Sequence, residues 1–101
     1  MSVDAAGKRL GLKQQVAYAL AKQGLLTTHF DARGHRRVTF DDLARFDVSY
    51  VSLSSVARDL SISPKAALRN IQARPVCGPG VDTNRQYFYR RADIMSERGL
   101  S

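Results

Sequence analysis

An internal repeat is the feature that most constrains the fold of this chain, because a segment beginning at Val3 is similar to one beginning at Leu53. At this offset of 50 residues, apolar or small side chains coincide at five of the first ten positions, and a basic side chain coincides at a sixth. With one extra residue in the second copy, the match resumes at Asp42 and Asp93. Sequence identity is low, so chance similarity is the alternative, but the shared order of elements favours two small units of one fold. The predicted domains are residues 1–50 and 51–101.

The second copy has the clearer helix signals. Ser52 is a good N-cap, and apolar residues then recur at helical spacing as one stripe. Ser63 and Pro64 suit the start of a second helix, since serine caps well and proline lacks the N–H that the first helical position leaves unpaired. We expect this helix over residues 64–73, ended by Pro75. The residues expected to face inward are Leu53, Val56, Ala57 and Leu60 in the first helix and Ala67, Leu68 and Ile71 in the second.

The first copy repeats this order with weaker signals. Gly11 supplies a sharp turn between two helices, the second of which we expect over residues 14–23. Gly24 then ends that helix in the left-handed conformation that glycine tolerates. The residues expected to face inward are Ala6, Leu10, Val16 or Ala17, Leu20 and Ala21, followed by Leu25 and Leu26 where the chain returns to the core.

A β-hairpin is expected after each pair of helices. In the first copy, residues 27–30 and 36–40 flank the turn-prone residues 31–34. In the second copy, residues 78–84 precede an aromatic segment over residues 85–89 that favours a strand. These hairpins would be the wings of a winged helix-turn-helix.

Each expected hairpin leads into a short helix. Thr39 and Asp42 match a capping box with aspartate in place of glutamate, and residues 92–95 are the counterpart in the second copy. Between the copies, residues 48–51 could form a short strand that pairs with a hairpin. The fold class that these elements predict is mainly α with small β-hairpin wings, arranged as a tandem winged helix-turn-helix.

The charge of the chain narrows the class of partner. Sixteen lysines and arginines stand against nine acidic residues, which gives a net charge of +7. Residues 1–50 carry eight basic and five acidic side chains (+3), and residues 51–101 carry eight and four (+4), so both copies are basic. A basic folded protein suits a polyanion, of which nucleic acid is the commonest. The alternative is a cationic protein with no such partner.

Several other classes of protein do not fit the sequence. No apolar run approaches the ~18 residues of a membrane span, and the N-terminus has no secretory signal. We therefore expect a cytoplasmic protein, associated with a prokaryotic nucleoid, that has no membrane partner. Cys77 is the one cysteine, so an intrachain disulfide and a thiolate zinc site are excluded. Nothing in the sequence specifies an oligomeric state.

Two helices joined by a tight turn suit DNA recognition, because the second helix can enter the major groove and present its N-terminal residues to base edges. The hairpin that follows would lie beside the neighbouring backbone or minor groove, where guanidinium groups match the geometry of phosphates. The expected hairpin cations are Arg33, His35, Arg36 and Arg37 in the first copy and Arg85, Arg90 and Arg91 in the second.

A family resemblance is carried by residues 10–16, 24–26 and 36–43 of the first copy and by residues 56–57, 60–63 and 87–94 of the second. These segments resemble the MerR/excisionase group of winged helix-turn-helix domains. Paired domains of this kind also occur in TniQ-like mobile-element proteins. The chain departs from the family pattern in two ways: it lacks the long C-terminal helix with which MerR regulators dimerise, and Pro75 replaces the usual Gly-x-Leu exit from the second helix.

The resemblance implies double-stranded DNA as the partner, and a role as a transcription regulator or as an accessory factor in recombination or excision. It also implies which helix side chains face the groove, for which a solvated helix face is the alternative interpretation. These are Lys13, Gln14, Gln15, Tyr18 and Lys22 in the first copy and Lys65, Arg69 and Asn70 in the second.

Catalysis is not indicated, because no reactive group has the partners that it would need. His29 and His35 flank one turn without a further metal ligand at the required spacing. Asp41 and Asp42 point apart at the start of a helix and suit capping, while Cys77 has no base nearby. We therefore expect no enzyme activity, no metal and no cofactor.

A protein–protein adaptor is the alternative from another class. One copy would then recruit a recombinase, a transposition protein or a polymerase subunit, with the same core and a different surface. Adaptor faces usually expose apolar or acidic patches, and the sequence indicates none beyond residues 25–26 and 87–89.

Overall fold

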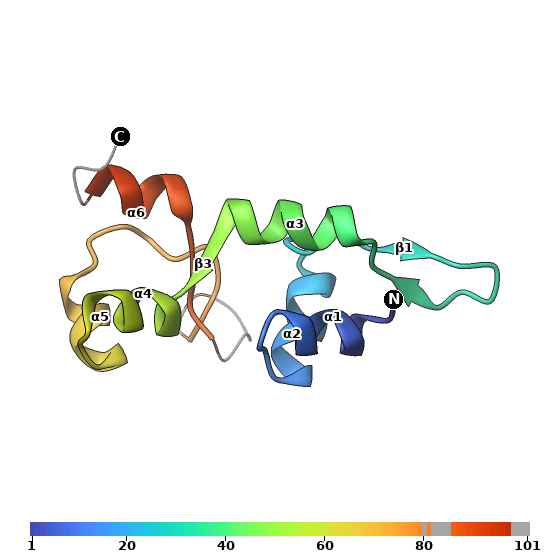
Figure 1. The fold of residues 1–101 in the computed structure, drawn as a ribbon, viewed down its shortest axis with the longest axis horizontal. Helices are drawn as coiled ribbons and strands as arrows, with labels where there is room; N and C mark the ends of the chain where they lie inside the picture. The colour runs from blue at the N-terminus through green and yellow to red at the C-terminus, as the bar shows by residue number, and fades with distance from the viewer. Residues whose placement is uncertain (80, 82–85, 98–101) are drawn as a thin grey trace. The chain divides into compact units, whose positions relative to one another are not determined.

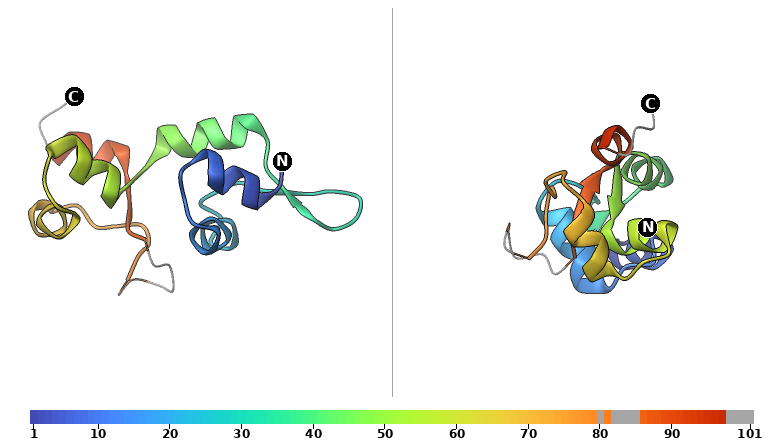
Figure 2. Two further views of the ribbon diagram at one scale, coloured as in Figure 1. Left: turned by 60° about the horizontal axis from the view of Figure 1, so that its bottom comes forward. Right: turned by 90° about the vertical axis from the view of Figure 1, so that its left-hand side faces the viewer.

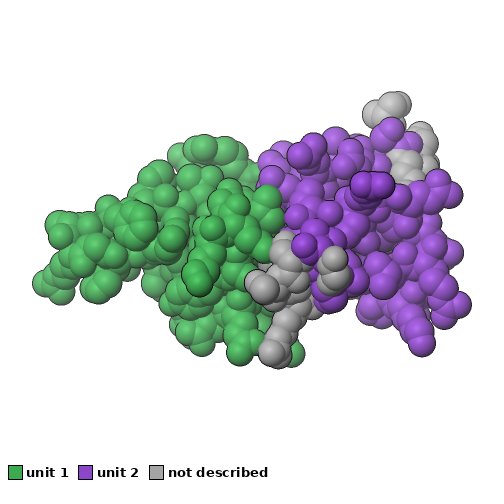
Figure 3. Space-filling view, turned by 180° about the vertical axis from the view of Figure 1, so that it is seen from behind, with its two compact units in different colours: residues 1–47 green, residues 48–101 purple. Residues whose placement is uncertain are grey.

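The computed structural model describes residues 1–79, 81 and 86–97 of the chain. The chain divides into two compact units, Met1–Asp47 and Val48–Ser101 (Figure 3). The described residues form six helices and two antiparallel sheets of two strands each. The expectation of a mainly helical fold with small strand pairs is therefore confirmed.

Unit 1 begins with two helices, α1 (Val3–Arg9) and α2 (Gln14–Lys22) (Figure 1). Ser2 caps α1, since its hydroxyl oxygen accepts a hydrogen bond from the N–H of Ala5 at 3.1 Å. Gly11 makes the turn between the helices with a φ of 72°, a left-handed conformation that strains any L side chain. The local signals in the sequence thus place both helices, with α2 one residue shorter than expected.

Helices α1 and α2 approach closely because Gly7 carries no side chain. A Cβ atom at Gly7 would lie only 2.7 Å from the Cβ of Ala17, which is closer than two carbon atoms can pack. The inward-facing residues predicted for α1 and α2 are buried, except that Leu10 is half-buried. The buried apolar residues of unit 1 are Val3, Ala6, Val16, Ala17, Leu20, Ala21, Leu26, Val38, Leu43 and Phe46.

A short antiparallel hairpin follows α2. Its strands are β1 (His29–Phe30) and β2 (Arg36–Arg37), each shorter than predicted. The hairpin extends away from the helices of unit 1 (Figures 1 and 2). In the strand register Phe30 lies opposite Arg36, so an aromatic ring and a guanidinium group share one face of the ribbon.

The turn of this hairpin is shaped by Asp31. Its Oδ1 atom accepts hydrogen bonds from the backbone N–H groups of Arg33 and His35, both at 2.9 Å. Gly34 completes the turn with a φ of 79°. The turn-prone segment predicted over residues 31–34 therefore forms with the side-chain chemistry that such a turn requires.

Helix α3 (Phe40–Ser49) follows the hairpin and starts with the predicted capping box. The N–H of Thr39 donates to Oδ2 of Asp42 at 2.9 Å, and the N–H of Asp42 donates to the hydroxyl of Thr39 at 3.0 Å. The helix is longer than expected. Its last turn takes up the start of the strand predicted over residues 48–51, so that strand begins at Tyr50 instead.

Unit 2 contains a second helix pair, α4 (Leu53–Leu60) and α5 (Pro64–Asn70). Ser52 caps α4 and Ser63 caps α5, each hydroxyl accepting the N–H of the residue three positions later at 3.1 Å. Pro64 occupies the first turn, as predicted. The core cluster of unit 2 consists of Val51, Leu53, Val56, Ala57, Ala67, Tyr89 and Ile94.

Helix α5 differs from the prediction in its length and in its buried residues. It ends three residues early, because Ile71 adopts an extended conformation (ψ 123°) and packs against the core cluster. Pro75 therefore does not set the end of the helix. Leu68 was expected to face inward but is 38% exposed, since the buried stripe of so short a helix passes through Ala67. Leu60 was also expected to face inward. It is the last residue of α4 and is 36% exposed, because the buried residues of that helix are Leu53, Val56 and Ala57.

The sheet of unit 2 pairs β3 (Tyr50–Ser52) with β4 (Phe88–Arg90) in antiparallel register. Val51 lies opposite Tyr89, and both are buried. Helix α6 (Arg91–Glu97) follows β4 directly. The sheet thus ties the segment before α4 to the segment before α6.

The hairpin predicted for the second copy forms in part. Among the described residues it is reduced to a bridge between Cys77 and Phe88, while β4 forms its ladder with β3. Phe88 thus pairs with Ser52 of β3 and also with Cys77, so the two pairings coexist on the two edges of the strand, and both Cys77 and Phe88 are buried. Residues 80 and 82–84 of the expected turn and Arg85, the first residue of the expected strand, lie outside the described residues.

The helices of the two units begin at the offsets at which the two copies align in the sequence. Helices α4 and α5 begin 50 residues after α1 and α2, and α6 begins 51 residues after α3. The strand pairing follows the same rule. An antiparallel bridge joins Ser2 to Arg37 in unit 1, and the matching residues of unit 2, Ser52 and Phe88, are paired in the β3–β4 ladder.

Candidate nucleic-acid interface

The outer face of α2 is polar because its inner face is occupied by core packing. The apolar side chains on its inner face, those of Val16, Ala17, Leu20 and Ala21, are buried. Tyr18, by contrast, is 44% exposed. The side chains that reach solvent are those predicted to face DNA, namely Lys13, Gln14, Gln15, Tyr18 and Lys22.

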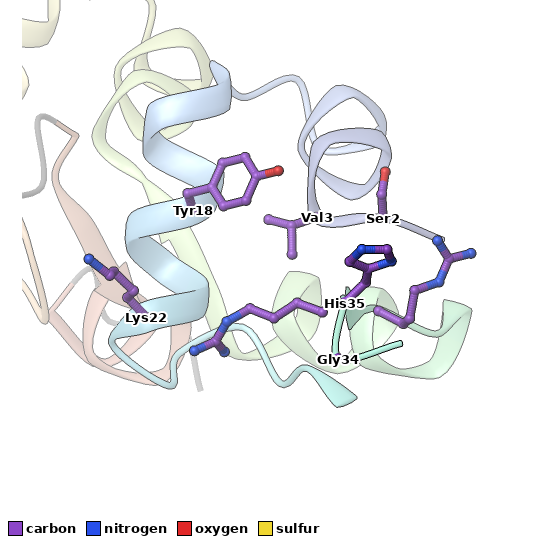
Figure 4. A pocket seen from close by; sticks show the side chains of 8 residues that line it. Ser2, Val3, Tyr18, Lys22, Gly34 and His35 are labelled. Carbon is purple, nitrogen blue, oxygen red and sulfur yellow. The ribbon is translucent and has the colours of Figure 1, made fainter. Parts of the chain in front are cut away.

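A pocket of about 640 Å³ lies in unit 1 between α2, the start of α1 and the hairpin. Tyr18 extends into it from α2 toward Val3, Lys22 lines it from the same helix with its ammonium group pointing away from the other labelled side chains, and His35 lies on the hairpin side (Figure 4). The pocket therefore brings together two groups of predicted DNA-facing residues, one from the helix and one from the hairpin. Its lining residues are Ser2, Val3, Tyr18, Lys22, Gly34, His35, Arg36 and Arg37.

The three arginines of the hairpin are held differently. Arg33 and Arg37 are exposed, whereas Arg36 is half-buried. The Nη1 atom of Arg36 donates to the hydroxyl of Thr28 at 2.9 Å. Its guanidinium carbon lies 5.0 Å from the ring centroid of Phe30, within the range of a cation–π contact. Sequence reasoning missed this contact, although the symmetric placement of both residues about the turn was a usable signal.

Each histidine of the hairpin is paired with an aspartate. Nε2 of His29 lies 3.0 Å from Oδ2 of Asp42, which connects β1 to the start of α3. At the tip, Nδ1 of His35 lies 3.7 Å from Oδ2 of Asp31. Neither pairing was expected from the sequence, and the His29–Asp42 contact was missed because it joins two elements.

Both aspartates have a pKa below the ordinary value of 3.8. For the exposed Asp31, the backbone N–H of His35 that donates to the carboxylate is the largest cause of the lowered pKa. Asp42 is 3% exposed, and this burial acts to raise its pKa. The hydrogen bonds from Thr39 and the proximity of His29 outweigh the burial, so the pKa of Asp42 is lowered overall.

Unit 2 presents a different set of side chains at the corresponding places. Lys65, Arg69 and Asn70 are exposed on α5, as predicted for a DNA-facing helix. Leu68 takes the position that corresponds to Tyr18 in α2. Arg90 is exposed at the end of β4. Arg91, at the start of α6, is half-buried and has a contact of its own.

Other kinds of site find little support in the described part of the chain. No group of three or more histidine, cysteine or acidic side chains is placed to hold a metal ion among the described residues. The thiol of Cys77 is buried and donates to the carbonyl oxygen of Gln86 at 3.8 Å. None of the described helices has the length and apolar character needed to span a membrane.

Comparison with known protein families, with curated proteins and with solved structures finds no match to this chain.

Proposed function

We propose that this chain binds double-stranded DNA through two winged helix-turn-helix units, with α2 and α5 as the recognition helices. It would act as a transcription regulator or as an accessory factor in recombination or excision. The observation that carries the proposal is the pocket of unit 1, which faces a polar helix on one side and a cationic hairpin on the other.

A DNA backbone strand is the ligand that best suits this pocket. Lys22, Arg36 and Arg37 supply three permanent positive charges around it, and a phosphodiester is a compact anion. A strand held there would leave Gln14 and Gln15, in the first turn of α2, beside the major groove. Glutamine can bond adenine with two hydrogen bonds at its major-groove edge.

Salt dependence is the direct test of this proposal. The full chain should bind a fluorescent duplex, and the logarithm of its affinity should fall linearly with the logarithm of the salt concentration. Replacing Lys22 and Arg37 by alanine should reduce the slope of that line by about two, because each lost phosphate contact removes nearly one unit.

The matched control removes the same charge elsewhere in unit 1. Lys8 and Arg45 are exposed and do not line the pocket. The Lys8→Ala/Arg45→Ala variant should keep a slope close to that of the unchanged protein. Absence of binding to any duplex at low salt would sink the proposal, and equal slopes for the two double variants would remove the pocket from it.

An adaptor role for unit 2 is the second candidate, favoured by its exposed leucines. Leu68 stands where unit 1 has Tyr18, and Leu60 is exposed at the end of the preceding helix. In this reading unit 1 binds DNA and unit 2 recruits a recombinase, a transposition protein or a polymerase subunit. A Lys65→Ala/Arg69→Ala variant with an unchanged salt slope would favour the adaptor role, and a reduced slope would favour DNA contact by α5.

A further inference from the structure

The outer face of α3 carries a line of apolar side chains. Phe40, Ala44 and Val48 are four residues apart, so they lie along one face of the helix as an outer stripe. All three are exposed, Phe40 at 65% and Val48 at 74%. The core uses other positions of the same helix, where Leu43 and Phe46 are buried. A helix that is apolar on two sides has more apolar surface than its own fold covers, which indicates a further contact on the outer stripe.

The ring of Phe40 is held in place at the surface. The guanidinium carbon of Arg9, the last residue of α1, lies 4.8 Å from the ring centroid, within the range of a cation–π contact. A ring that is already fixed loses little conformational freedom when a partner covers it. Phe40 is therefore preorganised for contact with another molecule.

Charged side chains beside the outer stripe restrict what can cover it. Asp41 and Arg45 stand on one flank of the stripe, and Asp47 stands on the other. All three are exposed. The two carboxylates would repel the phosphates of DNA, so the stripe does not suit a nucleic acid. A face with charges of both signs suits a partner with charges of both signs, and a second copy of this chain supplies such a face.

We propose that the outer stripe is a self-association surface, on which two copies of the chain pair their α3 helices antiparallel about a two-fold axis at Ala44. Phe40 of each copy then packs against Val48 of the other, because the two residues lie four positions from the axis on opposite sides of it. The small side chain of Ala44 lets the helices approach closely where they cross. Each copy contributes the same residues, so the interface closes on itself as a dimer.

Opposite charges meet in this arrangement, since the same flanks of two antiparallel helices face each other. Asp41 lies three residues before the axis and Arg45 lies one residue after it. Asp41 of one copy is therefore only about 3 Å along the axis from Arg45 of the other, at a rise of about 1.5 Å per residue. On the other flank, Asp47 comes beside Phe40 of the other copy, and the guanidinium group of Arg9 lies over that ring. A parallel pair would not bring Asp41 to Arg45.

The expected dimer is weak, because three side chains from each copy cover less than the about 1,600 Å² of a standard protein interface. Sedimentation equilibrium of the full chain from about 1 μM to about 1 mM spans the corresponding range of affinities. The average mass should rise with concentration from that of the monomer toward that of the dimer. The measurement contains no DNA, so its result is independent of the proposed function.

Variants of two exposed aromatic residues locate the contact. Phe40→Ala should raise the dissociation constant at least about tenfold, because each dimer loses two buried rings. Phe30→Ala is the matched control and should associate as the unchanged protein does. Phe30 is also 65% exposed and also carries an arginine, at 5.0 Å from its ring centroid, but it lies on the hairpin. Both variants should keep the helical circular dichroism spectrum of the unchanged protein, since neither ring is in the core.

Charge-reversed variants test the orientation. Asp41→Arg and Arg45→Asp should each weaken self-association at least about tenfold, because the four charges that meet on that flank then have one sign. An equimolar mixture of the two variants should associate again. In the mixed dimer, each arginine of one copy meets an aspartate of the other.

Three results would overturn the inference. The first is a chain that stays monomeric up to about 1 mM. The second is a Phe40→Ala variant that associates as strongly as Phe30→Ala, which would place any contact elsewhere on the molecule. The third is a mixture of the charge-reversed variants that associates no more strongly than its components, which would exclude the antiparallel pairing.

Discussion

Asp42 is the charged side chain that the fold of unit 1 buries most completely among the described residues. Its Oδ2 atom accepts the N–H of Thr39 and also lies within hydrogen-bond distance of His29. One carboxylate therefore caps α3 and fastens β1 to it. The position of the hairpin relative to α3, and with it one wall of the pocket, depends on this residue.

The stability of the chain should depend on pH through Asp42. Because its pKa is lower in the folded state than the ordinary 3.8, its ionised form stabilises the fold. That contribution is complete at pH values above the unfolded pKa and is lost as the pH falls through the folded pKa, that is, below about pH 4. Urea unfolding at pH 7 and at pH 3 should show the loss.

Substitution of Asp42 gives this prediction its control. Asp42→Asn should lower the free energy of unfolding at pH 7 by about 1–3 kcal/mol, the usual effect of weakening hydrogen bonds to a charged group. It should also lose less stability on acidification than the unchanged protein does. Asp41→Asn removes the same charge from an exposed neighbour and should behave like the unchanged protein. Identical acid sensitivity in the Asp42→Asn variant would contradict the assignment.

Single residues mark the limit of what the sequence predicts. Asp42 was identified as a cap because its partner Thr39 is three residues away, which is the usual spacing of a capping box at the start of a helix. His29 is thirteen residues away, and nothing in the sequence says that it lies beside the same carboxylate. Leu68 was wrongly expected to be buried, because apolar character does not show which of two neighbouring residues faces the core, and in the short helix α5 that residue is Ala67.

At the scale of elements, the pair α1–α2 depends on the absence of a side chain at Gly7. Elsewhere in a helix, replacing glycine by alanine is stabilising by about 0.5–1 kcal/mol. Here the added methyl group would meet the Cβ of Ala17, which has no rotamer by which to move aside. The contact between the two helices sets the position of the outer face of α2.

Gly7→Ala should therefore destabilise the chain by about 1–2 kcal/mol, because overpacking costs more than the gain in helix propensity returns. Chemical denaturation followed by circular dichroism would measure it. Lys8→Ala, at the exposed neighbouring position, should change the stability by less than about 0.5 kcal/mol. A Gly7→Ala variant that is more stable than the unchanged protein would show that the helices can separate freely.

Helix starts, tight turns and the first hairpin were predictable. Serine caps, positive-φ glycines and an aspartate turn each fix the backbone only a few residues away in sequence. The β3–β4 ladder was expected only in outline, as a strand between the copies that pairs with a hairpin, because Val51 and Tyr89 meet across 38 positions of sequence and local signals do not choose the partner. Most of the helical framework thus followed from local chemistry. In unit 2, β4 pairs with β3 and also forms a bridge through Phe88 to Cys77, and the register of these long-range pairings does not follow from local chemistry.

At the scale of the whole molecule, the two units follow one another without a separate linker, since α3 ends at Ser49 and β3 starts at the next residue. Both halves of the chain are basic, at +3 and +4. One chain carries two sets of exposed helix side chains, on α2 and on α5.

If both sets contact DNA, one monomer should protect two segments about one helical turn apart. Hydroxyl-radical footprinting, with the mass of the complex measured in parallel, would test this. The Lys65→Ala/Arg69→Ala variant should lose one protected segment, and the Lys22→Ala/Arg37→Ala variant should lose the other. Protection of a single segment by the unchanged monomer would assign DNA contact to one unit alone.

The common spacing of helix starts in the two units has a consequence for the history of the chain. A fixed offset, interrupted once by an added residue, is what tandem duplication of a half-length ancestor would leave behind. The buried positions Leu43 and Ile94 are apolar in both units, whereas Tyr18 of unit 1 corresponds to Leu68 of unit 2. An ancestor with one unit would have had one exposed recognition-helix face. After duplication, one of the two copies of that face would have been free to acquire a different partner.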